Sequence, residues 1–334
     1  LSVMKIAILG AGAIGTVIAG SLASIPNVEL LLSSRGEQAL ALMTTGLKLT
    51  GVVEKEISAS EWLVHPEGAE LPENWIRQTY YCIVCGKSAS TSDLAEIATQ
   101  LLSQEGLVFS LQNGILAEKI LSEKCGEHRV IGAITTHGAG RLSPGNTQWA
   151  GEGNIVLGSM NISAGEGAWA AEQSTPISHS IDGVGDLLDV LSEGGLSPQW
   201  TEDIHSMLWV KLLINCAINP IAAICGVENG ALFEIAELRE QSAAVMLEAA
   251  NVGRHSRINL PPDEELINTL NDVLQSTANN SCSMLQDIRN GKLTEIDAIT
   301  GEVVRIAEIL GMPVPLNSQL LVLIHGIESG LKIN

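Results

Sequence analysis

The chain has 334 residues, enough for two domains of ordinary size, and 46% of them are hydrophobic, so a sizeable core is expected. Its 38 Asp and Glu residues outnumber its 18 Lys and Arg residues and give a formal net charge of -20. Because such a surface repels phosphates and anionic lipid headgroups, we expect no nucleic acid and no membrane as partner. An anionic cofactor can still bind where the few cations gather.

Two apolar segments raise the question of targeting. Lys5 and the apolar run to Ile25 superficially resemble a signal peptide, but regular glycines and the strand-like run 6–9 predict a βα turn instead. The run 212–227 contains two asparagines and a proline, so we expect it to be too short and too polar for a transmembrane helix. We therefore expect a cytoplasmic protein.

Cysteine usage points to the same compartment. Cys82 and Cys85 form the one C-x-x-C pair, inside an apolar run that predicts a buried strand. Their side chains would point to opposite faces of that strand, which disfavours a redox or zinc pair. We expect buried free thiols in a reducing environment.

The first half of the chain alternates short apolar runs with helical patterns, as an α/β domain does. The predicted strands are 6–9, 28–32, 80–84, 108–111 and 130–135, and the predicted helices are 14–24 and 92–102. Segments 147–150 and 154–157 flank a Gly-Glu-Gly sequence that predicts a hairpin, so antiparallel strands are expected at the end of the sheet.

The second half changes character after a weakly patterned stretch. Residues 161–186 are rich in Gly, Ala and Ser and are expected to form a surface loop or insertion. A helix over 184–194 and a short extended piece near Trp200 follow. From about Glu202 helical periodicity dominates, with breaks predicted at 226–230, 261–262, near 291 and at 311–315.

The first candidate site is a glycine loop directly after the first predicted strand. It consists of Gly10, Ala11, Gly12, Ala13, Ile14 and Gly15. The first glycine permits a tight turn, the second lets the backbone approach a pyrophosphate, and the third lets the helix pack against the sheet. The strand before it and the helix after it are the context that supports a dinucleotide site. The alternative is a tight βα turn without a ligand.

Arg35 suggests which dinucleotide binds. Enzymes that use NAD usually carry Asp or Glu at the end of the second strand, to bond the ribose 2′-hydroxyl. Here the strand runs into Ser33, Ser34 and Arg35. A guanidinium can pair bidentately with a 2′-phosphate, which favours NADP. The alternative is a surface arginine at the start of a loop.

Lys87 and Asn113 follow two later strands, at the sheet edge where ligands of α/β proteins bind. Both are candidate cofactor or active-site contacts. Taken alone, however, a solvated lysine and an Asn-Gly turn explain them equally well.

A polar stripe marks an otherwise apolar helix predicted over 206–227. Lys211, Asn215 and Asn219 recur every four residues and so lie on one helix face. Buried polar groups need partners, and a ligand pocket would supply them. A structural network between helices is the alternative. The adjoining Pro220 predicts a kink or a helix end.

A second polar cluster runs from Asn279 to Arg289 and continues in 294–297. It includes Asn280, Ser283 and Glu295. By spacing alone it is a helix with a polar start and a charged end, for which helix capping and surface charge are a sufficient explanation.

The combination of these segments resembles the ketopantoate reductase (2-dehydropantoate 2-reductase) family. The resemblance lies in the glycine loop, in Gln112-Asn113-Gly114, and in the helix segment 208–220. It extends to Ser283-Met284-Leu285-Gln286-Asp287-Ile288 and to Thr294-Glu295-Ile296-Asp297. It implies an α/β fold with an N-terminal Rossmann-type dinucleotide-binding domain (1–202) and an all-helical C-terminal domain (203–334) that binds substrate, with a cleft between them.

The same resemblance implies reduction of 2-dehydropantoate by NADPH to (R)-pantoate, on the way to pantothenate and coenzyme A. Lys211 would be the general acid, and Glu295 would hold the substrate hydroxyl. Asn215, Asn219, Asn280 and Ser283 would contact the keto-acid substrate, Ser283 at its carboxylate. Asn113 would lie near the nicotinamide ribose, and Arg35 and Lys87 on the cofactor-phosphate side. A cation at the carbonyl oxygen stabilises the charge that develops there and can then donate its proton.

Two other functions remain open at this point. One is reduction of a different 2-keto or 3-keto acid on the same scaffold, and the other is a non-catalytic NADP-binding sensor. A homodimer is possible, but the sequence names no interface.

Overall fold

The computed structural model describes residues 3–160 and 184–331. They divide into two compact units, the first formed by 3–112, 117–160 and 184–204, and the second by 113–116 and 205–331. The loop or insertion predicted at 161–186 lies outside the described residues except for its last positions, where Gly185 begins a helix.

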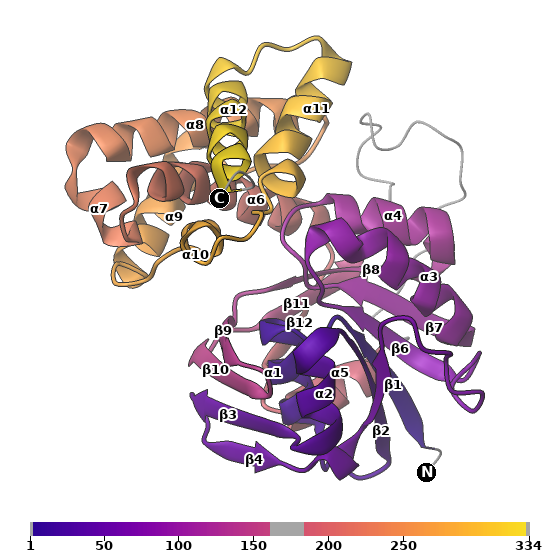
Figure 1. Cartoon of the computed structure of the whole chain (residues 1–334). Helices are drawn as coiled ribbons and strands as arrows, with labels where there is room; N and C mark the ends of the chain where they lie inside the picture. Colours follow the sequence, from indigo (N-terminus) through magenta and orange to yellow (C-terminus); the bar gives the residue numbers. More distant parts are fainter. Residues whose placement is uncertain (1–2, 161–183, 332–334) are drawn as a thin grey trace. The chain divides into compact units, whose positions relative to one another are not determined.

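The first unit is built on an eight-stranded sheet (Figure 1), in the order β12-β11-β8-β7-β6-β1-β2-β5. Every neighbouring pair is parallel except β8 and β11, so the antiparallel strand expected at the end of the sheet is present. The strands are β1 (Met4–Leu9), β2 (Val28–Ser34), β5 (Leu63–Pro66), β6 (Thr79–Val84), β7 (Leu102–Ser110), β8 (Val130–Thr135), β11 (Ile155–Ser159) and β12 (Pro198–Thr201).

Helices cover both faces of this sheet, which confirms the predicted α/β class (Figure 1). In β1, Ile6 and Ile8 pack with one set of helices, while Ala7 and Leu9 pack with the other. A strand buried on both faces needs a nearly continuous apolar run, which is why β1 was predictable. The first set is α1 (Ala13–Leu22), α2 (Gly36–Thr44) and α5 (Gly185–Glu193), and the second is α3 (Thr91–Leu101) and α4 (Leu116–Cys125). Short 3-10 turns are η1 (Ala59–Glu61), η2 (Ser88–Ser90) and η3 (Glu127–Arg129).

A second, four-stranded sheet packs on α1, in the order β4-β3-β10-β9. Its strands are β3 (Leu47–Gly51), β4 (Lys55–Ile57), β9 (Gly138–Ser143) and β10 (Asn146–Gly151). At Gly20 of α1, an added Cβ would lie only 2.6 Å from a methyl of Leu49. The helix is therefore enclosed between two sheets, an arrangement that the sequence did not predict.

The hairpin predicted across Gly151-Glu152-Gly153 is wrong. β10 pairs with β3 and β9 in the small sheet, whereas β11 pairs with β8 and β12 in the large one. The glycines carry the chain from one sheet to the other, past the backbone of Thr136, which would lie 2.4 Å from a Cβ at Gly153. The actual hairpin joins β9 to β10 through Gly145, where φ is +70°.

His137 holds this crossing together. Its Nδ1 accepts the Gly153 N–H at 2.9 Å, and its Nε2 lies 3.1 Å from the carbonyl oxygen of Leu196. A ring that accepts at Nδ1 and donates at Nε2 is the neutral imidazole. Burial of the ring is the largest cause that lowers the His137 pKa below its usual 6.5, outweighing the Leu196 hydrogen bond and the Glu152 charge, which raise it.

We expect the free energy of unfolding to fall as the pH drops from about 7 to 5, partly through His137. The unfolded chain binds a proton at its ordinary pKa of about 6.5, whereas the folded chain resists it, so acid favours unfolding. Urea titrations at several pH values measure this slope, and His137→Gln should make it shallower over that range. An unchanged slope in the variant would contradict the assignment.

The second unit is helical throughout its described part. Its elements are α6 (Ile204–Cys225), α7 (Asn229–Glu234), α8 (Ala236–His255), α9 (Asp263–Ser276), α10 (Ser283–Arg289), the π-helix η6 (Asp297–Gly301), α11 (Glu302–Leu310) and α12 (Pro315–Leu331). Breaks lie at each predicted position. The sequence missed the breaks at Ile235 and between α9 and α10.

Of the kink or helix end predicted at Pro220, the helix end is wrong, because α6 continues through the proline to Cys225. The expectation that the apolar run is too short and too polar to cross a membrane is also wrong, because the helix begins at Ile204 and is long and apolar enough. About two thirds of its most apolar part (67%) is buried inside the protein, which is how the core helix of a globular unit behaves.

The C-x-x-C cysteines are free thiols. Cys82 lies on β6 and is fully buried, and burial raises its pKa well above the usual range. Burial also raises the pKa of Cys85 to about 12. Cys85 follows the strand and is half-buried, so of the two only Cys82 is fully buried as predicted; both thiols are protonated at neutral pH and lack the thiolate that a nucleophilic cysteine needs.

Candidate functional site

The glycine loop lies at the point where the strand order of the large sheet reverses. The chain runs from β1 outward to β2 and β5 and then returns to β6 on the other side of β1. Ligands of open α/β sheets bind at the carboxyl ends of the strands beside such a switch point. Here those ends are Leu9 and Val84, and the Cys85 N–H donates to the Leu9 carbonyl at 2.8 Å.

Glycine stands at these three positions for different structural reasons. Gly10 has φ +94°, and a Cβ there would lie 2.4 Å from the backbone nitrogen of Gly86. A Cβ at Gly15 would lie 2.5 Å from the Gly10 carbonyl oxygen. At Gly12, by contrast, no atom of the described residues beyond its immediate chain neighbours and its own helix backbone lies within 4 Å of the Cβ position. Packing therefore requires Gly10 and Gly15, whereas Gly12 borders open space.

That open space lies at the N-terminus of α1. Gly12 is the N-cap residue, no side chain caps the helix, and the first turn carries no acidic residue. The first amides of a helix lack partners within the helix, and they attract anions through the helix dipole. Ala13 and Ile14 form this first turn, and the Ala11 N–H is held by the Ser33 carbonyl at 2.9 Å. The loop fits a dinucleotide pyrophosphate.

Two buried side chains that the sequence did not single out hold this loop. Gln38 of α2 donates to the Ala11 carbonyl at 3.2 Å and accepts the Gly145 N–H at 3.0 Å. Thr16 of α1 shares a hydrogen bond with Thr147 of β10 at 2.8 Å. The small sheet therefore anchors the loop and the first turn of α1. The Gln38–Gly145 and Thr16–Thr147 contacts have no local sequence signal, because their partners are more than 100 residues apart.

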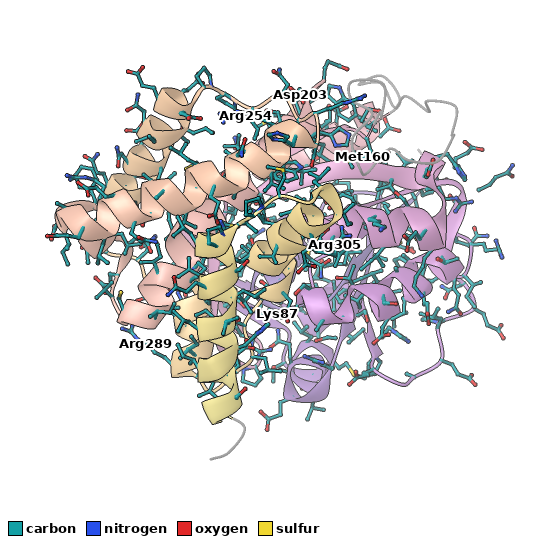
Figure 2. The ribbon with its side chains drawn as sticks, turned by 90° about the horizontal axis from the view of Figure 1, so that it is seen from above. Lys87, Met160, Asp203, Arg254, Arg289 and Arg305 are labelled. Carbon is teal, nitrogen blue, oxygen red and sulfur yellow. The ribbon has the colours of Figure 1, made fainter. Side chains whose placement is uncertain are left out.

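Arg35 and Lys87 follow the two strands, β2 and β6, that flank β1 in the sheet. Arg35 is exposed and directly follows β2 as the N-cap residue of α2, while Ser33 is buried and Ser34 half-buried. Lys87 (Figure 2) follows β6 and is also exposed. The Gln112 side chain donates to the Gly86 carbonyl at 2.7 Å and accepts from Thr91 at 3.0 Å, so it orders the turn that carries Lys87.

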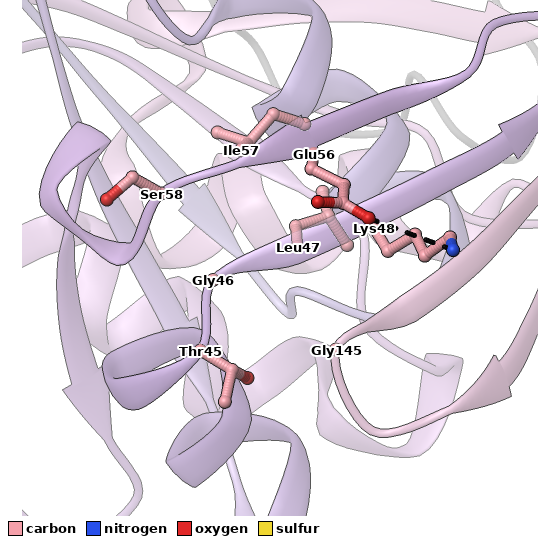
Figure 3. Close-up of a pocket in the computed structure, with 8 residues that line it drawn as sticks. All are labelled: Thr45, Gly46, Leu47, Lys48, Glu56, Ile57, Ser58 and Gly145. Atoms are coloured by element: carbon pink, nitrogen blue, oxygen red, sulfur yellow. Dashed lines mark ion pairs between the residues drawn. The ribbon is translucent and has the colours of Figure 1, made fainter.

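A pocket of about 370 Å³ also opens in the first unit (Figure 3). It contains none of the predicted site residues. An ion pair between Lys48 Nζ and Glu56 Oε1, 3.8 Å long, lies beside it, and both side chains are largely exposed. Its residues are Thr45, Gly46, Leu47, Lys48, Glu56, Ile57, Ser58 and Gly145.

In the second unit, the polar stripe on α6 is present as predicted. Lys211 and Asn215 are half-buried and Asn219 is buried, within a helix whose other residues are mostly apolar. Among the described residues the Nδ2 atom of Asn215 has no hydrogen-bond partner, although it is shielded from solvent. A buried donor without a partner is costly in a folded protein, and a bound polar ligand would satisfy it.

Two predicted residues from distant segments meet directly in the second unit. Asn113 Nδ2 donates to Glu295 Oε2 at 3.1 Å. The adjoining Gly114 has φ +92°, and its Cβ would lie 2.2 Å from the Ala298 carbonyl oxygen, so the 113–116 segment packs tightly against η6. Glu295 is 8% exposed, so its carboxylate is held in place rather than solvated.

Asn280 and Ser283 lie at the start of α10 and are both exposed. The Cys282 thiol next to Ser283 donates to the carbonyl of Asn219 at 3.6 Å, which brings the start of α10 to the polar stripe of α6. Arg289 at the end of α10 (Figure 2) donates to Ser281 Oγ at 3.2 Å and to the Gly226 carbonyl at 3.1 Å. The second unit therefore gathers Asn219 and Ser283 near each other, and pairs Asn113 with Glu295.

Comparison with known proteins agrees with this organisation. Residues 6–161 match the family described as "Ketopantoate reductase PanE/ApbA", and residues 203–328 match "Ketopantoate reductase PanE/ApbA C terminal". A 2-dehydropantoate 2-reductase of Archaeoglobus fulgidus is 32% identical over 331 residues, which cover 99% of this chain and 100% of that protein.

Solved structures show the same similarity. A PanE/ApbA family ketopantoate reductase from Ralstonia eutropha JMP134 has a TM-score of 0.81 and 26% identity, covering 98% of this chain and 100% of its own. The ternary structure of D-mandelate dehydrogenase with NADH and anilino(oxo)acetate has a TM-score of 0.84, 26% identity and the same coverage. With two family matches and a full-length relative, the chain belongs to the ketopantoate reductase family.

Proposed function

We propose that this protein reduces 2-dehydropantoate to (R)-pantoate with NADPH: 2-dehydropantoate + NADPH + H⁺ → (R)-pantoate + NADP⁺. The observation that carries the proposal is the polar stripe of α6, a lysine and two asparagines in an apolar helix, one of them with an unsatisfied buried donor. Named relatives with the 2-dehydropantoate 2-reductase activity support the choice of substrate.

Lys211 is the proposed general acid. When bound, NADPH supplies a hydride to the ketone carbon, which leaves negative charge on the carbonyl oxygen. An ammonium placed at that oxygen stabilises the charge and then gives it a proton. Asn215 and Asn219, one and two turns further along α6, are proposed to orient the keto acid, and Ser283 and Asn280 to contact its polar ends.

Glu295 is proposed to hold the substrate hydroxyl. A carboxylate is an acceptor, so it can take a hydrogen bond from an alcohol while it also accepts from Asn113. The Asn113 contact supports this role because it orients the Glu295 carboxylate. In addition to this contact, we propose that Asn113 lies near the nicotinamide ribose.

The cofactor is proposed to be NADPH rather than NADH. The glycine loop supports a dinucleotide, and D-mandelate dehydrogenase, a structural relative, carries NADH. Arg35 supports the choice of NADPH, because an exposed guanidinium at the end of β2 matches the charge and geometry of a 2′-phosphate. Lys87 is proposed to contact the cofactor phosphates.

Arg35→Ala should lower the preference for NADPH over NADH about tenfold or more, since a hydrogen bond to a charged group contributes about 1.5–3 kcal/mol. The preference is measured as the ratio of kcat/KM values for the two cofactors. Glu37→Gln is the matched control on the same turn of α2, and it should leave the ratio unaltered. An unchanged ratio of kcat/KM values in Arg35→Ala would contradict the proposed contact between Arg35 and the 2′-phosphate.

The substrate is tested by steady-state NADPH oxidation with a panel of 2-keto and 3-keto acids, including 2-dehydropantoate and an aryl 2-keto acid. We expect 2-dehydropantoate to have the highest kcat/KM. If another keto acid exceeds it clearly, the protein is a reductase of that acid on the same scaffold.

A further inference from the structure

Helix α12 holds the chain on both sides of Glu295. The Thr294 N–H and the Thr294 hydroxyl both donate to Glu328 Oε1, each at 2.7 Å. Three residues further along the chain, Asp297 Oδ1 lies 2.9 Å from His325 Nε2. Because Glu328 and His325 are one turn apart on α12, two side chains of one helix fasten the residues on either side of Glu295.

Thr294 transmits the position of Glu328 to the backbone around Glu295. Its Oγ1, which donates to Glu328, also accepts the Ile296 N–H at 3.2 Å. The Ile296 N–H, in the peptide unit directly after Glu295, is therefore tied to the Glu328 carboxylate through the hydroxyl, and the Thr294 N–H, one peptide unit further upstream, is tied to it directly. A displacement of Glu328 would change the backbone on both sides of Glu295.

Burial strengthens the Glu328 part of this fastening, whereas the His325–Asp297 pair is largely exposed and contributes less. Glu328 is 9% exposed and Glu295 is 8% exposed, so neither carboxylate is held by bulk water. Hydrogen bonds to a carboxylate are stronger than those between neutral groups, and a buried carboxylate requires them. Both Glu328 bonds to Thr294 converge on one oxygen, which is the geometry of a rigid anchor rather than of a mobile surface pair.

We propose that Glu328 is a positioning residue for the reduction, which acts through Thr294 to place the Glu295 carboxylate. The proposal rests on the role of Glu295 in the proposed function. Glu328 itself contacts neither substrate nor cofactor. The physical reason for an effect on rate is that a misplacement of about 1 Å in a catalytic site can cost about a hundredfold.

The test compares Glu328→Leu with Glu328→Gln. Leucine removes both acceptor bonds, whereas glutamine keeps an Oε1 that can accept both. We expect Glu328→Leu to lower kcat/KM for 2-dehydropantoate about tenfold to a hundredfold, with an unchanged KM for NADPH, and Glu328→Gln to restore it to within about threefold.

Glu248→Leu is the matched control. Glu248 of α8 accepts the Leu316 N–H at 3.1 Å and the Asn317 N–H at 2.8 Å, at the opposite end of α12. The Glu248→Leu variant therefore removes a similar carboxylate anchor of α12 and leaves the contacts of the Glu295 segment intact. We expect Glu248→Leu to lower the melting temperature while kcat/KM, measured where the protein is folded, stays at the wild-type value.

Several results would overturn the inference. Wild-type kcat/KM in Glu328→Leu would do so, and so would an equal loss in Glu248→Leu, which would indicate a general effect of α12 on stability. If Glu328→Leu does not fold, Thr294→Val removes only the hydroxyl and Thr294→Ser restores it, and unaltered kinetics in Thr294→Val would reject the inference. Glu295→Leu, which removes the acceptor, separates the two proposals: if it retains full activity, the role of Glu295 itself is wrong.

Discussion

Lys211→Ala should lower kcat for 2-dehydropantoate reduction about a thousandfold, while NADPH binding stays within a few-fold of the wild type. General acid catalysis typically contributes about 10²–10⁴ in rate, and here the same group also stabilises the charge on the carbonyl oxygen. Steady-state kinetics measure kcat, and fluorescence titration with NADPH measures binding separately.

Two further variants sharpen the assignment of the acid. Lys211→Arg keeps the charge but cannot donate a proton at neutral pH, so it should recover part of the binding of substrate and little of kcat. Added primary amines should partly rescue Lys211→Ala and should not affect Lys211→Arg. Lys119→Ala, which removes an exposed lysine paired with Glu123, is the control and should have wild-type kinetics.

Lys211→Ala also tests the alternative that the protein is a non-catalytic NADP-binding sensor. A protein that only senses NADP would show no keto-acid-dependent NADPH oxidation in the wild type, and Lys211→Ala would leave its behaviour unchanged. Either result would exclude Lys211 as the acid. The Asn215 side-chain donor one turn away, which has no partner among the described residues, fits a polar ligand at this face of α6.

Gly12→Ala should weaken NADPH binding about tenfold to a hundredfold without lowering the melting temperature. Beyond its immediate chain neighbours and its own helix backbone, no atom of the described residues lies within 4 Å of the Cβ position, so the folded chain accepts the methyl group. A bound pyrophosphate would occupy that space, and overpacking a tight contact typically costs about 1–3 kcal/mol. NADPH titration and thermal unfolding of the variant measure the two quantities.

Gly10→Ala is the counterpart, with the opposite expectation for stability. The left-handed φ of +94° and a Cβ 2.4 Å from the Gly86 nitrogen force the strand end to move. Strained backbone of this kind costs about 1–3 kcal/mol, so the melting temperature should fall clearly. If both variants lost stability equally, or if Gly12→Ala bound NADPH normally, the pyrophosphate would not lie over Gly12.

Much of the large sheet was predictable for a physical reason. Strands such as β8 (Val130–Thr135) are buried on both faces and therefore appear as continuous apolar runs between turn residues. The small sheet was missed because its strands bury at most one face and therefore lack continuous apolar runs. Its central pair, β3 and β10, joins residues nearly 100 positions apart, such as Lys48 and Asn146. No sequence pattern near either residue predicts that pairing.

The chemical groups of the candidate site could be identified from the sequence alone. It showed a glycine loop after an apolar strand, an arginine instead of an acid at the end of β2, and a lysine–asparagine stripe in an apolar helix. These features are local, because strand, turn and helix preferences depend on residues only a few positions apart.

The three-dimensional structure was needed to show which of these groups are held in place, and by which partners. It distinguished Gly12, which borders open space, from Gly10, which packing requires. It paired Asn113 with Glu295 across 182 positions, and it tied Thr294 to Glu328. Such contacts depend on how the whole chain packs, so no local pattern contains them. The glycine loop and the α6 stripe can therefore be predicted from the sequence, whereas the side chains that hold the site residues in place cannot.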